Sequence, residues 1–143
     1  MRLVSFDFDN TLTRRPLSHI YSNASMKASQ KLRINYDAVR MIRKEQSERN
    51  ARVIIVTTRF ENERAEIDQV IDRAGLKIDT VHFTGGSFKA PLLKELGVDR
   101  HYEDNAQEIA QCIEHGIEVY HVPNPFAYPS PLTGPEGTPT IYS

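Results

Sequence analysis

The stretch RVIIVT, residues 52–57, is the strongest strand signal in the chain. Its centre is an unbroken run of β-branched aliphatic residues from Val53 to Val56. Such a run fits a strand that is buried on both faces, which is typical of a parallel sheet covered by helices on both sides. The other apolar runs of the chain are therefore expected to be its neighbours in one sheet.

Strand patterns alternate with helix patterns along the chain. We predict strands over residues 3–8, 52–57, 80–84, 100–103 and 117–122. We predict helices over residues 36–49, 62–74, 88–96 and 106–115, with Asn35 and Asn105 as N-caps and Gly75, Gly97 and Gly116 at the C-terminal ends. This order predicts an α/β fold with a doubly wound, Rossmann-like parallel sheet of about five strands. Ligands of such sheets bind at the carboxyl ends of the strands.

Length and composition indicate one domain followed by a tail. The chain has 143 residues, and residues 1–122 carry all the predicted strands and helices. Residues 123–143 contain six of the eight prolines, so we expect this tail to form no sheet or helix core and to wrap the surface, contact a partner or be disordered. Residues 13–34 are poorly periodic and are predicted to form a flap over the site.

Charge and cysteine content exclude several classes of protein. A net charge of −1 gives no global attraction to nucleic acid or to a membrane surface. The single cysteine, Cys112, excludes an internal disulfide and is predicted to be a packing residue. The sequence contains no long apolar stretch, so we expect a cytoplasmic protein that does not enter the membrane.

Polar side chains follow four of the predicted strands at their carboxyl ends. They are Asp7 and Asp9 after the first strand, Thr57, Thr58 and Arg59 after the second, Lys89 after the third, and Glu103 and Asp104 at the end of the fourth, with Glu108 one helical turn later. Carboxylates at one crevice suit Mg²⁺ together with a substrate phosphate. A carboxylate can attack phosphorus, a lysine and a metal can offset the charge, and a second acid can protonate the leaving oxygen. The pattern therefore predicts magnesium-dependent phosphate chemistry.

These residues, in this order, resemble four motifs of the haloacid dehalogenase (HAD) superfamily, in its phosphatase branch. The motifs are Asp-x-Asp-x-Thr at residues 7–11, the strand-ending Thr57 in VIIVTTR, Lys89 in GGSFKAPLLKEL, and the acidic pair Glu103-Asp104 in HYEDN. The resemblance covers roughly residues 3 to 122. The fourth motif departs from the common Gly-Asp form, which leaves Glu103 or Glu108 as a candidate to assist the metal.

The resemblance implies a role for each matched residue. Asp7 is implied to be the nucleophile that forms an aspartyl phosphate, and Asp9 the general acid and then base. Thr57 is implied to hold the phosphoryl group, although Thr58 is an alternative, and Lys89 to neutralise charge. The implied Mg²⁺ ligands are Asp7, Asp9 through its backbone carbonyl, and Asp104. Beside these we expect Asn10, Thr58 and Arg59 to contact substrate.

The spacing of the motifs leaves no room for a full cap domain, so the chain resembles HAD phosphatases without a cap. Such enzymes have open sites and often act on large substrates. The segments GGSFKAPLLKEL and HYEDN also resemble HAD proteins grouped with polynucleotide end-repair phosphatases. The expected partner is therefore a phosphorylated substrate, a nucleotide or a polynucleotide end, with Arg14, Arg15 and Arg59 near the site mouth. A small-metabolite phosphatase is an alternative.

Two other functions remain as alternatives from different classes. A non-catalytic binding module of the same fold would not need the complete set of Asp7, Asp9, Thr57, Lys89 and Asp104. A signalling receiver domain also uses Asp, Thr, Lys and Mg²⁺, but its acceptor aspartate follows a later strand. Both explain the sequence less well than a phosphoric monoester hydrolase does.

Overall fold

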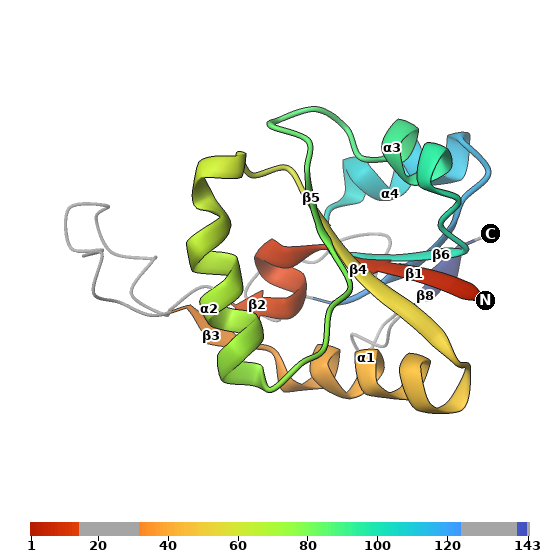
Figure 1. The fold of residues 1–143 in the computed structure, drawn as a ribbon. Coiled ribbons are helices and arrows are strands. Elements are labelled where there is room, and N and C mark those ends of the chain that lie inside the picture. The colour runs from red at the N-terminus through yellow and green to blue at the C-terminus, as the bar shows by residue number, and fades with distance from the viewer. Residues whose placement is uncertain (15–31, 124–139, 143) are drawn as a thin grey trace.

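A computed structural model describes residues 1–14, 32–123 and 140–142 of the chain (Figure 1). Its main sheet has the strand order β5-β4-β1-β6-β7-β8. The first five of these strands are parallel, and helices cover both faces of the sheet, which confirms the predicted doubly wound, Rossmann-like α/β fold. The strands of this sheet are β1 (Arg2–Phe6), β4 (Ala51–Thr57), β5 (Val81–Phe83), β6 (Arg100–Glu103), β7 (Glu118–His121) and β8 (Thr140–Tyr142).

Two apolar cores lie on opposite faces of the sheet. Alternate residues of β4 supply them: Val53 and Ile55 belong to one core, and Ile54 and Val56 to the other. The first core packs under α1 (Tyr36–Glu48) and α2 (Arg64–Ala74), and the second under α3 (Ala90–Leu96) and α4 (Ala106–Glu114). The run Val53–Val56 is thus buried on both sides, as its composition predicts.

The helix ends follow the predicted capping residues. The side chain of Asn35 accepts a hydrogen bond from the backbone N–H of Asp37, and Asn105 accepts from those of Gln107 and Glu108. Gly75 and Gly97 end α2 and α3 with positive φ angles of 65° and 75°, a conformation that costs glycine little. Pro91 lies in the first turn of α3, where its missing N–H is not needed.

The end of the first strand differs from the prediction. β1 ends at Phe6, and residues Phe8–Leu12 form a short, irregular helical turn, η1. Asp7 is still extended, and its N–H donates to the carbonyl of Tyr102 over 2.9 Å. The chain then turns at Asn10, whose φ of 62° lies in the left-handed region that asparagine tolerates better than most residues. The predicted helix over residues 62–74 likewise begins as a separate turn, η4 (Glu61–Glu63), before α2.

The proline-rich tail contributes a strand, so the expectation that it takes no part in the sheet is wrong for three residues. Thr140–Tyr142 pairs antiparallel with β7 as the edge strand β8, with Ile141 opposite Tyr120. The two ends of the predicted flap also pair, because β2 (Thr13–Arg14) and β3 (Arg33–Ile34) form an antiparallel ribbon. Residues 15–31, which make up the rest of that segment, lie outside the described residues, as do residues 124–139.

Among the described residues, none of the helices is long and apolar enough to cross a lipid bilayer. Cys112 is fully buried in the core beneath α3 and α4, which confirms its predicted packing role.

Candidate active site

Parallel pairing of β1 with β4 and β6 brings the predicted site residues to one edge of the sheet. Phe6 lies opposite Ile55 on one side and Tyr102 on the other, and the rings of Phe6 and Tyr102 stack with centroids 4.1 Å apart. In this register Asp7 and Glu103 are neighbours at the carboxyl ends of β1 and β6. The carboxylates that follow β1 and β6 therefore face the same cleft, about 310 Å³ in volume.

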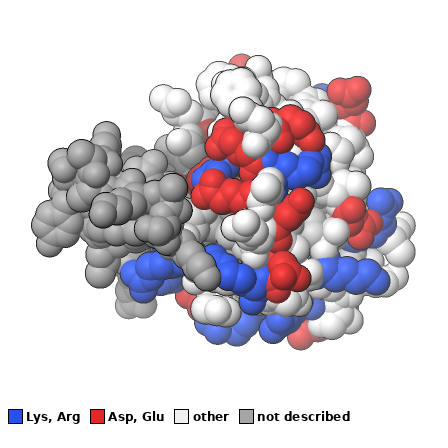
Figure 2. Space-filling view, turned by 60° about the vertical axis from the view of Figure 1, so that its left-hand side comes forward, with Lys and Arg blue, Asp and Glu red and all other residues white. Residues whose placement is uncertain are grey.

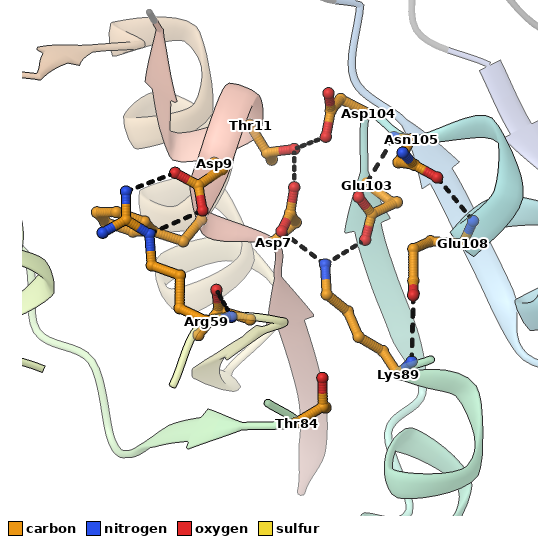
Figure 3. Close-up of polar contacts among 12 residues, drawn as sticks. Asp7, Asp9, Thr11, Arg59, Thr84, Lys89, Glu103, Asp104, Asn105 and Glu108 are labelled. Atoms are coloured by element: carbon orange, nitrogen blue, oxygen red, sulfur yellow. Dashed lines mark hydrogen bonds and ion pairs between the residues drawn. The ribbon is translucent and has the colours of Figure 1, made fainter. Parts of the chain in front are cut away.

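Asp7 lies at the centre of the site, and both of its carboxylate oxygens are engaged (Figure 3). Oδ1 accepts a hydrogen bond of 2.6 Å from Nζ of Lys89. Oδ2 accepts one of 3.1 Å from Oγ1 of Thr11, which also lies 3.4 Å from Oδ1 of Asp104. The threonine of the first motif thus lies between the two aspartates.

Lys89 is a buried cation between two acids. Its Nζ donates to Oδ1 of Asp7 and, over 2.7 Å, to Oε1 of Glu103, and only 2% of its side chain is exposed. Its backbone N–H points to the carboxylate of Glu108, with its nitrogen 3.2 and 3.3 Å from the two oxygens. Lys94, the alternative lysine on α3, is exposed to solvent. The structure therefore brings Lys89 to Asp7 and Glu103, as the third motif predicts.

The carboxylates of the site differ in their pKa values because their surroundings differ. Burial raises the pKa of Asp7 well above its ordinary value, and the negative charge of Glu103 adds to this effect. Burial likewise raises the pKa of Asp104, to about 6. Burial acts in the same direction on Glu103, but Lys89 and His101 outweigh it and hold the pKa of that group below its usual range. Asp7 and Asp104 are thus acids whose charged forms are disfavoured by burial, whereas the charged form of Glu103 is favoured by its partners.

A cation would meet an all-oxygen set of ligands here. One carboxylate oxygen from each of Asp7, Glu103 and Asp104 lies within 4.8 Å of the others. Oε1 of Glu103 already binds Lys89 and His101, and its Oε2 lies 3.3 Å from the backbone nitrogen of Asn105. Asp104, which Thr11 contacts over 3.4 Å, is consequently the freest of the three to bind a metal, with Asp7 beside it, and the oxygen set fits a hard divalent cation.

Asp9 belongs to the same turn as Asp7, but its carboxylate faces Arg59 (Figure 3). Nε and Nη2 of Arg59 each donate a 2.8 Å hydrogen bond to one oxygen of Asp9. Nη1 of the same guanidinium donates to Glu63 over 3.2 Å and to Glu66 over 2.8 Å. The hydrogen bond to Asp9 is the main reason that the pKa of Arg59 is raised. The structure therefore pairs Arg59, a predicted substrate contact, with three acids.

The other residues predicted to contact substrate differ in how deeply their side chains are buried. Asn10 and Thr58 line the cleft, and the buried side-chain oxygen of Asn10 makes no hydrogen bond within the described part of the chain. Thr57 is fully buried, and its Oγ1 accepts the N–H of Arg59 over 3.2 Å. A hydroxyl that accepts in this way can still donate its own proton.

Arg14 does not join the cleft. It donates to the side chain of Asn35 over 3.1 Å and pairs with Asp37 at the start of α1. Arg15 lies outside the described residues. Of Arg14 and Arg59, the structure brings Arg59 beside the cleft, through its contact with Asp9.

Sequence reasoning did not find the buried chain behind Glu103. Nδ1 of His101 lies 2.7 Å from Oγ of Ser5, and its Nε2 lies 2.8 Å from Oε1 of Glu103. His101 is fully buried, which lowers its pKa, so the neutral ring accepts from Ser5 and donates to Glu103. A signal existed, because residues two apart on a strand share a face and Ser5 pairs with His101 in the sheet.

A scan against protein-family models found no match for the sequence, and neither did a search of curated proteins. The site is therefore interpreted from its own geometry together with the motif resemblance.

Proposed function

We propose that this protein is a metal-dependent phosphoric monoester hydrolase of the HAD type that acts through an aspartyl phosphate on Asp7. The observation that carries the proposal is the buried contact of 2.6 Å between Lys89 and Asp7, next to Asp104, at the carboxyl edge of a parallel sheet. A buried carboxylate fixed by a lysine is a suitable nucleophile because the ammonium also attracts the incoming phosphate.

The acids fit a divalent metal ion. Three carboxylates, those of the buried Asp7 and Glu103 and the partly buried Asp104, stand beside the single ammonium of Lys89, so a dication would balance the charge. Burial and the charge of Glu103 raise the pKa values of Asp7 and Asp104, and a nearby cation would favour their charged forms. Asp7 and Asp104, with the backbone carbonyl of Asp9, would hold Mg²⁺. When bound, the ion would neutralise charge on the phosphoryl group.

Each step of the proposed reaction can be assigned to residues of the cleft. An oxygen of Asp7 attacks phosphorus, the bond from phosphorus to the leaving oxygen breaks, and Asp9 supplies the proton that the leaving oxygen takes up. Asp9 then removes a proton from water, which attacks phosphorus, releases inorganic phosphate and restores Asp7. Thr58, which lines the cleft, supplies a hydroxyl group for the phosphoryl oxygens, whereas the fully buried Thr57 holds the turn by accepting the N–H of Arg59. Asp9 lines the cleft while Arg59 holds its carboxylate, so Arg59 would fix the direction from which Asp9 exchanges its proton.

The motif resemblance favours a nucleotide or polynucleotide end as substrate, in a site without a full cap domain. The ends of the predicted flap pair in the ribbon β2–β3, which is far smaller than a cap domain in its described part. A small-metabolite phosphatase uses the same chemistry and differs only in the leaving group. The chemistry and the substrate class are therefore tested separately.

Phosphate release tests the chemistry. We expect the purified protein to hydrolyse p-nitrophenyl phosphate with Mg²⁺ and to lose this activity with excess chelator. Asp7→Asn should abolish turnover while the protein stays folded, because Lys89 keeps its contact with Glu103 and a buried charge is removed. Asp72→Asn, the same chemical change at an exposed position of α2, is the matched control.

The outcomes separate the alternatives. Turnover of Asp7→Asn at the wild-type rate would exclude the aspartyl-phosphate mechanism. Accumulation of a long-lived phosphorylated Asp7 would favour a signalling receiver. An absence of phosphate release from every ester would favour a binding module.

A further inference from the structure

Two exposed phenylalanine side chains lie beside the cleft. Phe60 is 59% exposed and Phe88 is 48% exposed, whereas Phe6 and Phe8 are fully buried. Large apolar side chains exposed next to a polar cleft are informative, because both rings could contact a ligand and neither is needed in the core. We call these two residues the aromatic rim.

Phe88 is part of the cleft itself. It lines the cleft together with Gly86, and it directly precedes Lys89, whose ammonium binds Asp7. Lys89, which would face the phosphoryl group, is buried, whereas Phe88 is exposed and lines the same cleft. A group attached to that phosphoryl group can therefore reach the Phe88 ring from within the cleft.

Phe60 is tied to the same loop from the other side. The N–H of Gly86 donates to the carbonyl of Thr58 over 2.8 Å, and the N–H of Gly85 donates to that of Arg59 over 3.2 Å. The Phe60 ring lies so close to Gly85 that a Cβ there would approach a ring carbon to 3.3 Å. Both aromatic residues therefore sit on segments that are hydrogen-bonded to each other at the edge of the cleft.

The charges around the cleft disfavour a leaving group that carries further negative charge. Five acids line it, and Lys89 is the one basic residue that does so in the described structure; the acids are Asp7, Asp9, Glu103, Asp104 and Glu108. Arg59 beside it is already paired with Asp9, Glu63 and Glu66. Figure 2 shows acidic side chains gathered on the upper part of this face, with basic side chains mainly in a band below. A bound metal ion would balance the negative charge of one phosphate group. The described cleft would then have no further positive charge for the other phosphates of a polynucleotide.

We propose that the cleft accepts a phosphomonoester with a single phosphate whose leaving group carries a flat, uncharged aromatic ring, packed against Phe88 with Phe60 at its outer edge. This inference rests on the proposed hydrolase function and names its substrate class. Aromatic rings stack favourably by about 0.5–1.5 kcal/mol beyond the area they bury, which corresponds to about a 2- to 12-fold preference. The ring can belong to a nucleoside or to a phenol-type group, since both present the same flat apolar face.

A matched pair of esters tests the aromatic preference. Benzyl phosphate and cyclohexylmethyl phosphate both release a primary alcohol of similar size, and only the first has an aromatic ring. We expect wild-type kcat/KM to favour benzyl phosphate by about 2- to 12-fold. Phe88→Leu, which keeps an apolar side chain, should bring this ratio close to about one. Tyr36→Leu removes an exposed aromatic ring on α1, away from the cleft, and should keep the wild-type ratio.

Three further esters separate the sources of the ring and the effect of charge. A nucleoside 5′-monophosphate and O-phosphotyrosine distinguish a nucleoside from a phenol-type ring, and preference for either supports the proposal. A 5′-phosphorylated oligonucleotide, with its additional phosphates, should be hydrolysed more slowly than the mononucleotide at low salt. Faster hydrolysis of the oligonucleotide would overturn the proposal, and so would a benzyl preference that Phe88→Leu leaves unchanged. Failure to hydrolyse any ester, p-nitrophenyl phosphate included, would instead remove the proposed function on which the inference rests.

Discussion

Arg59 holds Asp9 through two parallel hydrogen bonds of 2.8 Å, one to each carboxylate oxygen. The guanidinium is itself fixed by Glu63 and Glu66, and its carbon lies 5.1 Å from the centre of the Phe8 ring. A planar guanidinium forms such a two-pronged contact and an ammonium does not. The direction of the Asp9 side chain is therefore set by Arg59.

Replacement of this arginine by lysine tests whether the contact matters for turnover. Arg59→Lys keeps the positive charge but cannot form the two parallel hydrogen bonds to Asp9. The carboxylate of Asp9 should therefore be oriented less precisely, and kcat for p-nitrophenyl phosphate should fall about tenfold. Arg52→Lys, at an exposed arginine that pairs with Asp79, is the matched control and should keep the wild-type rate. Equal kcat values for Arg59→Lys and the wild type would show that Asp9 does not depend on Arg59 for its orientation.

Removal of the buried ammonium should destabilise the fold. Lys89→Met leaves Asp7 and Glu103 buried without their shared cation, and breaking a buried pair in this way typically costs about 3–5 kcal/mol. Urea denaturation would measure the free energy of unfolding. Lys94→Met, at an exposed site on the same helix, should change it by less than about 0.5 kcal/mol.

A second substitution checks the physical reason for that loss. Glu103→Gln, added to Lys89→Met, removes one of the two uncompensated charges and should recover part of the lost stability. Independent, additive effects of the two substitutions would contradict a direct interaction between Lys89 and Glu103.

The free energy of unfolding should depend on pH through the protonation of His101. Burial lowers the pKa of this histidine from 6.5, so the unfolded chain binds a proton that the folded protein does not. This contribution to stability is present above pH 6.5 and is lost as the pH falls below it, by at most about 1.4 kcal/mol per pH unit. His101→Gln should remove this part of the slope, although it weakens the protein at every pH by disrupting the contacts to Ser5 and Glu103.

Comparison with another histidine isolates the effect. His82 is only partly buried on β5, the edge strand of the parallel part of the sheet, and His82→Gln is the matched control for the loss of a histidine side chain. Superimposable slopes for the wild type and His101→Gln would mean that His101 takes up its proton equally in the folded and unfolded states.

Local patterns were sufficient to predict most of the fold. The β-branched run Val53–Val56 lies in β4 as predicted, and α1 begins at its predicted cap, because β-branched runs and capping side chains act on their immediate neighbours. The edge strand β8 could not be predicted in this way. Thr140–Tyr142 is a short segment after many prolines, and its pairing with β7 depends on residues far away in the sequence.

The sequence predicted which residues form the candidate site, but it did not predict which side chains contact one another there. The ends of parallel strands meet at one edge of a sheet, so Asp7, Lys89 and Asp104 were expected together, and the structure brings them together. The pairing of Asp9 with Arg59 depends on side-chain directions across 50 positions of sequence. No local pattern contains that information.

Metal binding should stabilise the protein through the same acids. Mg²⁺ that binds only the folded state should raise the free energy of unfolding by about 2.7 kcal/mol at a concentration 100 times its dissociation constant. Asp104→Asn removes the carboxylate freest to bind the ion and should abolish most of this increase, whereas Asp72→Asn, on the exposed surface of α2, should keep it. Thermal unfolding with Mg²⁺ and with chelator measures the difference in each variant without relying on activity. An equal response to Mg²⁺ in Asp104→Asn and the wild type would place the ion elsewhere, and the buried acids around Lys89 would then act without it.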